Sequence, residues 1–207
     1  MKKHQVHNLI ILDESGSMNS IKKTIINGFN DLINSLKSIE KEFIEQEHFI
    51  SLISFNSKKD NNIIHFTESV SKIEKINDEN YNPESSTPLF DSMGLSILKL
   101  KHYLSDKNNY SVLVTILTDG EENASKEFSL IAIKRLIEEL KSENWTFTYI
   151  GTEHDVDTTS LDLNINNSIC FEKNDIGIKK MFEIETTSRI KYSLSIRNGK
   201  KINNDYY

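Results

Sequence analysis

Short apolar runs that alternate with longer amphipathic stretches constrain the fold of this chain more than any other feature of its sequence. Residues 6–12, 49–55, 112–117 and 147–150 are almost continuously apolar and rich in β-branched and aromatic side chains. Runs of this length and character are typical of strands that are buried on both faces. The four runs therefore predict the interior strands of a sheet.

Two further runs predict additional strands of that sheet. Residues 63–70 follow the second interior strand after the polar turn NSKKDNN, and this spacing favours an antiparallel edge strand. Residues 168–171 are a shorter and weaker run, which predicts the last strand.

Helical periodicity fills the stretches between the strands. Apolar residues recur at steps of three and four over residues 21–43, which predicts an amphipathic helix. Pro88 favours the start of a second helix, and Thr87 before it is placed to act as the cap. The remaining predicted helices are residues 126–142, with Ser125 as the cap, and about residues 175–195.

Strands that alternate with helices of this length imply parallel neighbours, because parallel strands need crossover connections. The predicted fold class is α/β and doubly wound, with a mostly parallel central sheet, helices on both faces and one antiparallel edge strand. The 207 residues suit one domain, predicted over residues 1–196, and a polar, mobile tail over residues 197–207. Ligands of such sheets bind outside the carboxyl ends of the strands.

Composition argues against several classes of partner. The formal net charge of -6 disfavours nucleic acid, since affinity for the phosphate backbone comes largely from Lys and Arg. The single cysteine, Cys170, allows no intramolecular disulfide, and the first apolar run is too short for a signal peptide or a membrane span. These features predict a cytoplasmic protein without nucleic-acid or membrane partners.

Two aspartates stand at the ends of buried runs, Asp13 in IILD and Asp119 in ILTD. A carboxylate there is costly to desolvate unless it is hydrogen-bonded, paired or bound to a cation. Ser15 and Ser17 follow Asp13 at alternate positions, so the three oxygens can converge, and Thr87 would add another from a third loop. Carboxylates and hydroxyls without His or Cys favour Mg²⁺, with Mn²⁺ or Ca²⁺ as substitutes, over zinc.

Simpler structural roles explain each of these residues taken singly. Residues 13–17 suit an Asx turn and a helix cap, Thr87 suits an N-cap, and Asp119 belongs to an Asp-Gly turn signal. None of these roles accounts for all three segments together, whereas a shared cation does. Ser85 and Ser86 near Thr87, and Thr118 beside Asp119, are alternative sources of the additional hydroxyl.

The motifs DESGSM, STPLFD and TDGEEN, in this order, resemble the von Willebrand factor A domain with its metal-ion-dependent adhesion site. The resemblance extends over about residues 5–171 and is greatest to small bacterial cytoplasmic members. It implies that Ser15, Ser17 and Thr87 approach the cation alongside Asp13 and Asp119, some through water. It also implies that a Glu or Asp of a partner protein completes the coordination shell.

The resulting hypothesis is a Mg²⁺-dependent protein–protein interaction module rather than an enzyme. The alternative is a metal-dependent phosphoryl-transfer or hydrolytic enzyme on a similar sheet. Phosphatases resembling the haloacid dehalogenases place a general acid two residues after the first aspartate, and here that position is Ser15. A scaffold with a degenerate site is a third alternative, and the absence of a divalent ion from the purified protein would favour it.

Overall fold

The computed structural model of the protein describes residues 2–152, 156–200 and 205–207. Six strands form one sheet in the order β3-β2-β1-β4-β5-β6. Neighbouring strands run parallel except β2 and β3, which are antiparallel, so the predicted fold class is confirmed. The strands are β1 (His4–Asp13), β2 (Gln46–Asn56), β3 (Asp60–Ser69), β4 (Tyr110–Leu117), β5 (Trp145–Gly151) and β6 (Asn167–Cys170).

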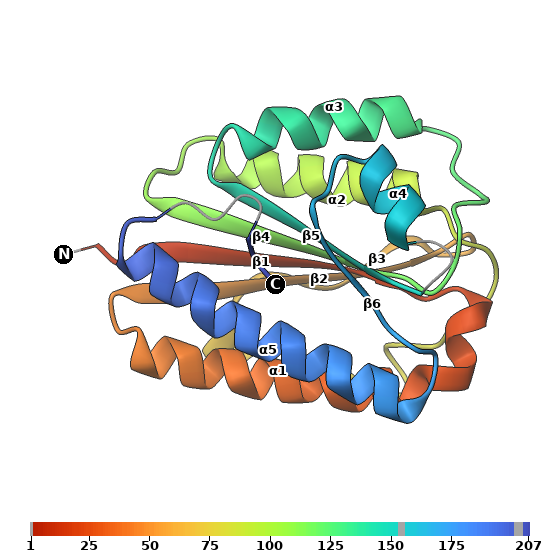
Figure 1. Ribbon diagram of the computed structural model, residues 1–207, viewed down its shortest axis with the longest axis horizontal. Helices are drawn as coiled ribbons and strands as arrows, with labels where there is room; N and C mark the ends of the chain where they lie inside the picture. The colour runs from red at the N-terminus through yellow and green to blue at the C-terminus, as the bar shows by residue number, and fades with distance from the viewer. Residues whose placement is uncertain (1, 153–155, 201–204) are drawn as a thin grey trace.

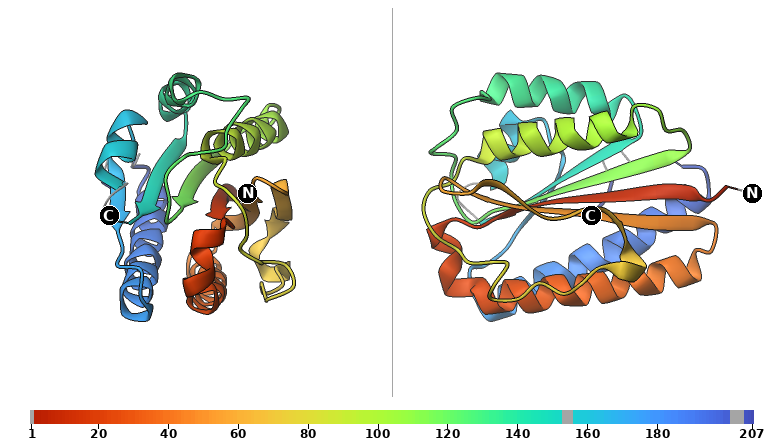
Figure 2. Two further views of the ribbon diagram at one scale, coloured as in Figure 1. Left: turned by 90° about the vertical axis from the view of Figure 1, so that its right-hand side faces the viewer. Right: turned by 180° about the vertical axis from the view of Figure 1, so that it is seen from behind.

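Helices cover both faces of the sheet. In Figures 1 and 2, α1 and α5 lie side by side on one face, and α2, α3 and α4 lie on the other. Successive residues of β1 point to opposite faces: Ile10 and Leu12 join the core under α1 and α5, while Leu9 and Ile11 join the core under α2 and α3. The helical elements are η1 (Gly16–Ile21), α1 (Lys22–Glu42), η2 (Val70–Lys72), α2 (Leu89–Leu104), α3 (Leu130–Lys141), α4 (Val156–Asp162) and α5 (Asp175–Arg197).

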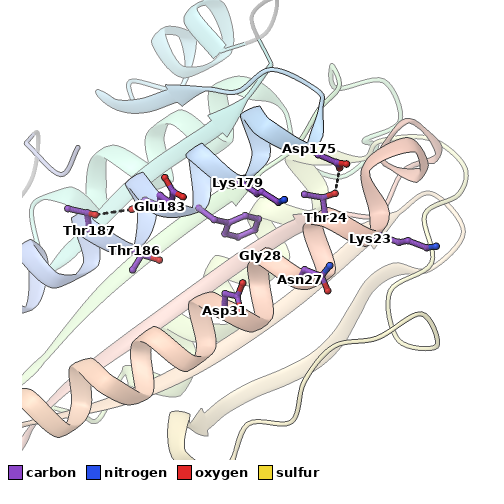
Figure 3. A pocket seen from close by; sticks show the side chains of 11 residues that line it. Lys23, Thr24, Asn27, Gly28, Asp31, Asp175, Lys179, Glu183, Thr186 and Thr187 are labelled. Atoms are coloured by element: carbon purple, nitrogen blue, oxygen red, sulfur yellow. Dashed lines mark hydrogen bonds between the residues drawn. The ribbon is translucent and has the colours of Figure 1, made fainter.

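Helices α1 and α5 approach closely because α1 has a glycine at the contact. A Cβ on Gly28 would lie 2.1 Å from a ring carbon of Phe182, so any larger residue would displace that ring. At the start of α5, Thr24 donates a hydrogen bond to Asp175 across the same contact. Figure 3 shows the polar groove that remains between the two helices. No helix within the described ranges is both long enough and apolar enough to span a membrane.

Helix α3 begins later than predicted. It starts at Leu130, and Ser129 rather than Ser125 is its cap, with its side chain accepting a hydrogen bond from Ala132 N. The predicted first turn, residues 126–128, instead donates its three backbone N–H groups to the carboxylate of Asp91 on α2. A carboxylate from another helix therefore holds this segment as a loop.

The described residues of the predicted tail, 197–200 and 205–207, include side chains that contact the body of the domain. Arg197 still belongs to α5 and pairs with Glu45, its Nε lying 2.7 Å from a carboxylate oxygen. Tyr206 is 1% exposed, and the hydroxyls of Tyr206 and Tyr207 donate to the two carboxylate oxygens of the buried Glu185 at 3.2 and 3.1 Å. Residues 201–204 of the predicted tail lie outside the described residues.

His7 on β1 and His48 on β2 are the most deeply buried histidines of the described part of the sheet. Burial, followed by the positive charges of Lys107 and His4, lowers the pKa of His7 to about 4. Burial, followed by Arg189 and His4, lowers the pKa of His48 to about 3. Both side chains therefore remain neutral in the folded protein well below the ordinary histidine pKa of about 6.5.

Acid is expected to destabilise the fold through these histidines. From pH 6.5 down to about 4 the unfolded chain binds their protons and the folded protein does not, so the free energy of unfolding falls as pH falls. Asp13 acts in the opposite sense below about pH 6, because its folded pKa is raised to about 6. Two histidines less one aspartate leave the unfolded chain with about one more bound proton than the folded protein. The free energy of unfolding should therefore fall by about 1.4 kcal/mol per pH unit.

Urea unfolding at pH 7.5 and pH 4.5 measures this slope. The His7→Phe variant keeps the aromatic stacking on Phe49, whose ring centroid lies 5.0 Å from that of His7. It should lose most of the acid destabilisation, since it removes one of the two groups that titrate only in the unfolded chain. The same pH dependence in the variant and the wild type would contradict this assignment.

Candidate metal centre

The predicted site lies where the connections from two adjacent parallel strands diverge. Strands β1 and β4 are neighbours, but β1 leads to α1 on one face and β4 leads to α3 on the other. The crevice between such connections is the usual ligand site of a doubly wound sheet. Figure 1 shows η1 and the loop that leads into α5 at this same end of the molecule.

Asp13 ends β1, and its carboxylate is fully buried. One oxygen accepts the backbone N–H of Ser15 at 2.7 Å, and the other accepts the Thr118 hydroxyl at 2.6 Å. Burial raises the pKa of Asp13 to about 6, the bonds from Thr118 and Ser15 oppose this shift, and the charge of Asp119 adds to it. A carboxylate in these surroundings would be stabilised by a nearby cation.

A chain of oxygen contacts connects the first motif to the end of β4. The hydroxyl oxygens of Ser15 and Ser17 are 3.0 Å apart, and Ser17 donates to Asp119 Oδ1 at 2.5 Å. The other oxygen, Asp119 Oδ2, lies 2.6 Å from the ammonium of Lys173. Residues more than a hundred positions apart in the sequence thus meet at one point of the sheet edge.

Thr87 joins this group from the loop before α2. A Cβ added to Gly120 would lie 3.7 Å from Ser17 Oγ and 3.8 Å from Thr87 Oγ1, so both hydroxyls face the same small space above Gly120. Helix α2 begins after Pro88 without a side-chain cap hydrogen bond, so the predicted capping role of Thr87 is wrong. Its backbone is instead held by Asn123, through Thr87 N to Asn123 Oδ1 at 2.9 Å and Asn123 N to Thr87 O at 3.1 Å.

Two acidic residues beside the motif residues shape the loops. Glu14 is fully buried and accepts the Ser54 hydroxyl at 2.7 Å, while its other oxygen pairs with Lys59 at 2.9 Å. Glu122 accepts hydrogen bonds from the backbone of Phe90 and from Ser125. Both carboxylates are committed to holding the loops that carry the site.

Sequence reasoning missed two partners of the aspartates. The sequence indicates Thr118 only as an alternative ligand, whereas in the structure its hydroxyl supports Asp13 and also accepts the N–H of Gly120 at 3.2 Å. Its position beside Asp119 was the signal. Lys173 was not identified, because its contact with Asp119 depends on how β6 is aligned in the sheet.

The donor set suits a hard cation. Two carboxylates and three hydroxyls gather here, and among the described residues no group of three or more His, Cys, Asp or Glu side chains has the arrangement of a metal site. Oxygen donors of mixed charge are typical of Mg²⁺, Mn²⁺ or Ca²⁺. Ser17 is exposed, so one side of this group faces solvent.

A doubly wound sheet with aspartates and hydroxyls gathered at the carboxyl ends of its central strands defines a class of α/β domains. The family model of the von Willebrand factor type A domain matches residues 9–183, and the chain belongs to this family. Domains of this family commonly mediate protein–protein interactions, and many bind a divalent metal. No curated protein matches the chain in sequence.

Solved structures share the fold at low sequence identity. Proximal thread matrix protein 1 from the mussel byssus has a TM-score of 0.59 and 12% identity over 91% of this chain. The pilus adhesin SpaC from Lactobacillus rhamnosus GG has a TM-score of 0.65 and 12% sequence identity over 93% of this chain. The chain spans 47% of the mussel protein and 31% of SpaC. Manganese-loaded Plasmodium vivax TRAP protein has a TM-score of 0.54 and 18% sequence identity. The match covers 88% of this chain and 74% of TRAP.

Proposed function

We propose that this domain binds Mg²⁺ through Asp13, Ser15, Ser17, Thr87 and Asp119 and captures an acidic residue of a partner protein. The observation that carries the proposal is the chain of hydrogen bonds from the Asp13 carboxylate, through the backbone N–H of Ser15 and the hydroxyls of Ser15 and Ser17, to Asp119, with Thr87 facing the same space. A metal-loaded relative of the same fold, the manganese-bound TRAP protein, supports it.

The charges of the site suit a carboxylate partner only when a cation is present. Asp13 and Asp119 would repel an incoming Glu or Asp, and a bound divalent ion would supply both the compensating charge and an open coordination position. The neutral hydroxyls of Ser15, Ser17 and Thr87 add ligands without adding negative charge. The cation would therefore keep enough positive charge to attract an acidic side chain.

The hydrolytic alternative requires an activated nucleophile. Ser15 and Ser17 are the hydroxyls in position, but they contact each other and Asp119 rather than a histidine base. Asp119 is itself paired with Lys173. An interaction module agrees with these contacts better than an enzyme does.

Removal of the divalent ion is expected to release the partner. The immobilised protein should retain a partner from a native lysate in 5 mM Mg²⁺ and release it in EDTA, on the order of a hundredfold less remaining bound, because the acidic residue would lose its ligand. A column of the Asp13→Asn variant is the control and should retain nothing that EDTA elutes. Equal retention with and without the chelator would refute metal-dependent capture.

A further inference from the structure

Lys173 places a positive charge at the candidate metal centre. It lies in the loop between β6 and α5, and its ammonium is 2.6 Å from Asp119 Oδ2. The Asp119 carboxylate is fully buried, whereas the Lys173 side chain is 35% exposed. The pair therefore has one partner fixed in the protein and one at the surface.

The backbone on both sides of Lys173 is held in place. Phe171 N donates to Gly151 O at 2.9 Å, which fixes the end of β6 against β5. Asn174 caps α5 by accepting the N–H of Gly177 at 2.8 Å, and its own N–H donates to Glu172 O at 2.7 Å. Lys173 is thus directed at Asp119 by a short loop anchored at both ends.

The two oxygens of Asp119 have different partners. Oδ1 accepts the hydroxyl of Ser17, which belongs to the proposed ligand set, and Oδ2 faces Lys173. The lysine therefore neutralises Asp119 from the side opposite the hydroxyls. At this distance and degree of burial, one unit of charge changes the binding of another ion substantially.

We infer that Lys173 sets the charge of the metal centre, weakening its hold on the cation and strengthening its hold on the partner's carboxylate. This inference rests on the proposed function. With Lys173, the two aspartates and a divalent cation leave one net positive charge, and without it they leave none. The lysine repels the cation and attracts the acidic residue, so the two affinities must respond to its removal in opposite directions.

The Lys173→Met variant tests the first half of this inference, because methionine keeps an unbranched apolar side chain and removes the charge. Calorimetric titration with Mg²⁺ and with Mn²⁺ should give a dissociation constant at least about tenfold lower for the variant than for the wild type. Lys173→Arg should behave like the wild type. Lys179→Met is the matched control, since Lys179 lies on α5 beside the groove of Figure 3 and should leave the affinity within twofold.

Acetate, as a simple carboxylate, tests the second half of the inference, that Lys173 strengthens carboxylate binding. Added at constant ionic strength to protein saturated with Mg²⁺ and followed by chemical-shift titration, it should bind at least about threefold more weakly to Lys173→Met than to the wild type. Unchanged or weaker metal binding in Lys173→Met would overturn the inference, and unchanged acetate binding would overturn its second half.

Failure of the proposed function gives a different pattern. If neither the wild type nor Lys173→Met binds Mg²⁺, the metal site itself is refuted, and the role of Lys173 with it. If only the variant binds Mg²⁺, the charge effect of Lys173 is supported while the proposed function of the natural protein is overturned. Thermal unfolding of each variant verifies that the fold is intact.

Discussion

Replacement of Asp13 by asparagine is expected to remove Mg²⁺ binding and to leave the fold at least as stable as that of the wild type. Asp13 is fully buried, and burial raises its pKa to about 6, so its charge at neutral pH destabilises the folded protein. Each pKa unit corresponds to about 1.4 kcal/mol. Asparagine keeps an acceptor for Ser15 N, and the Thr118 hydroxyl can accept from the new amide.

The loss of metal affinity should be at least about a hundredfold, because the variant removes one of the two proposed charged ligands. Calorimetric titration with Mg²⁺ and urea unfolding of the metal-free protein measure the two effects. Stability should be unchanged or higher by an amount on the order of 1 kcal/mol, since lost hydrogen-bond strength offsets part of the relieved desolvation. Lost Mg²⁺ affinity without lost stability distinguishes a metal ligand from a residue that only supports the fold.

Glu14→Gln is the matched control for this prediction. Glu14 is the next residue and equally buried, but its contacts are with Ser54, Lys59 and the N–H of Asn82. Its replacement should lower stability and keep Mg²⁺ affinity within a few-fold of the wild type. Wild-type affinity in Asp13→Asn would show that Asp13 does not hold the cation.

The sequence predicts the fold well because the fold depends on local patterns. Strand-length apolar runs and helical periodicity recur along the whole chain, and their order is enough to define a doubly wound sheet. The convergence of Asp13, Ser15, Ser17 and Asp119 follows from the same pattern, since the carboxyl ends of β1 and β4 must meet at one edge. Their assignment as metal ligands remains a prediction.

The features that the sequence did not predict depend on contacts between distant segments. The predicted start of α3 is wrong because the backbone N–H groups of residues 126–128 donate to Asp91, which lies on another helix. Lys173 has no motif around it, and only the alignment of β6 brings it to Asp119. Glu185 and Arg189 stand four residues apart on α5, a spacing typical of exposed helical ion pairs, yet both are buried.

That buried pair gives the largest expected effect on stability. Arg189 Nη2 lies 2.8 Å from Glu185 Oε1, and the same guanidinium donates to Asn8 on β1 and to Thr115 on β4. Glu185→Ala would leave this guanidinium buried without its carboxylate and would also remove the acceptor of the Tyr206 hydroxyl. The free energy of unfolding is expected to fall by about 3–5 kcal/mol, measured by urea unfolding at pH 7.5.

We expect the stability loss in Glu185→Ala to come from the unpaired buried guanidinium of Arg189 rather than from the net contribution of the ion pair. A double variant separates these two causes. Glu185→Leu combined with Arg189→Met removes both charges and fills similar volume, so it should recover most of the stability lost in Glu185→Ala. Glu183→Ala, on the exposed side of the same helix, should change stability by less than about 0.5 kcal/mol. If Glu185→Ala costs under about 1 kcal/mol, the buried pair does not hold α5 and the terminal tyrosines on the sheet. If the double variant is no more stable than Glu185→Ala, the unpaired guanidinium is not the cause of the loss.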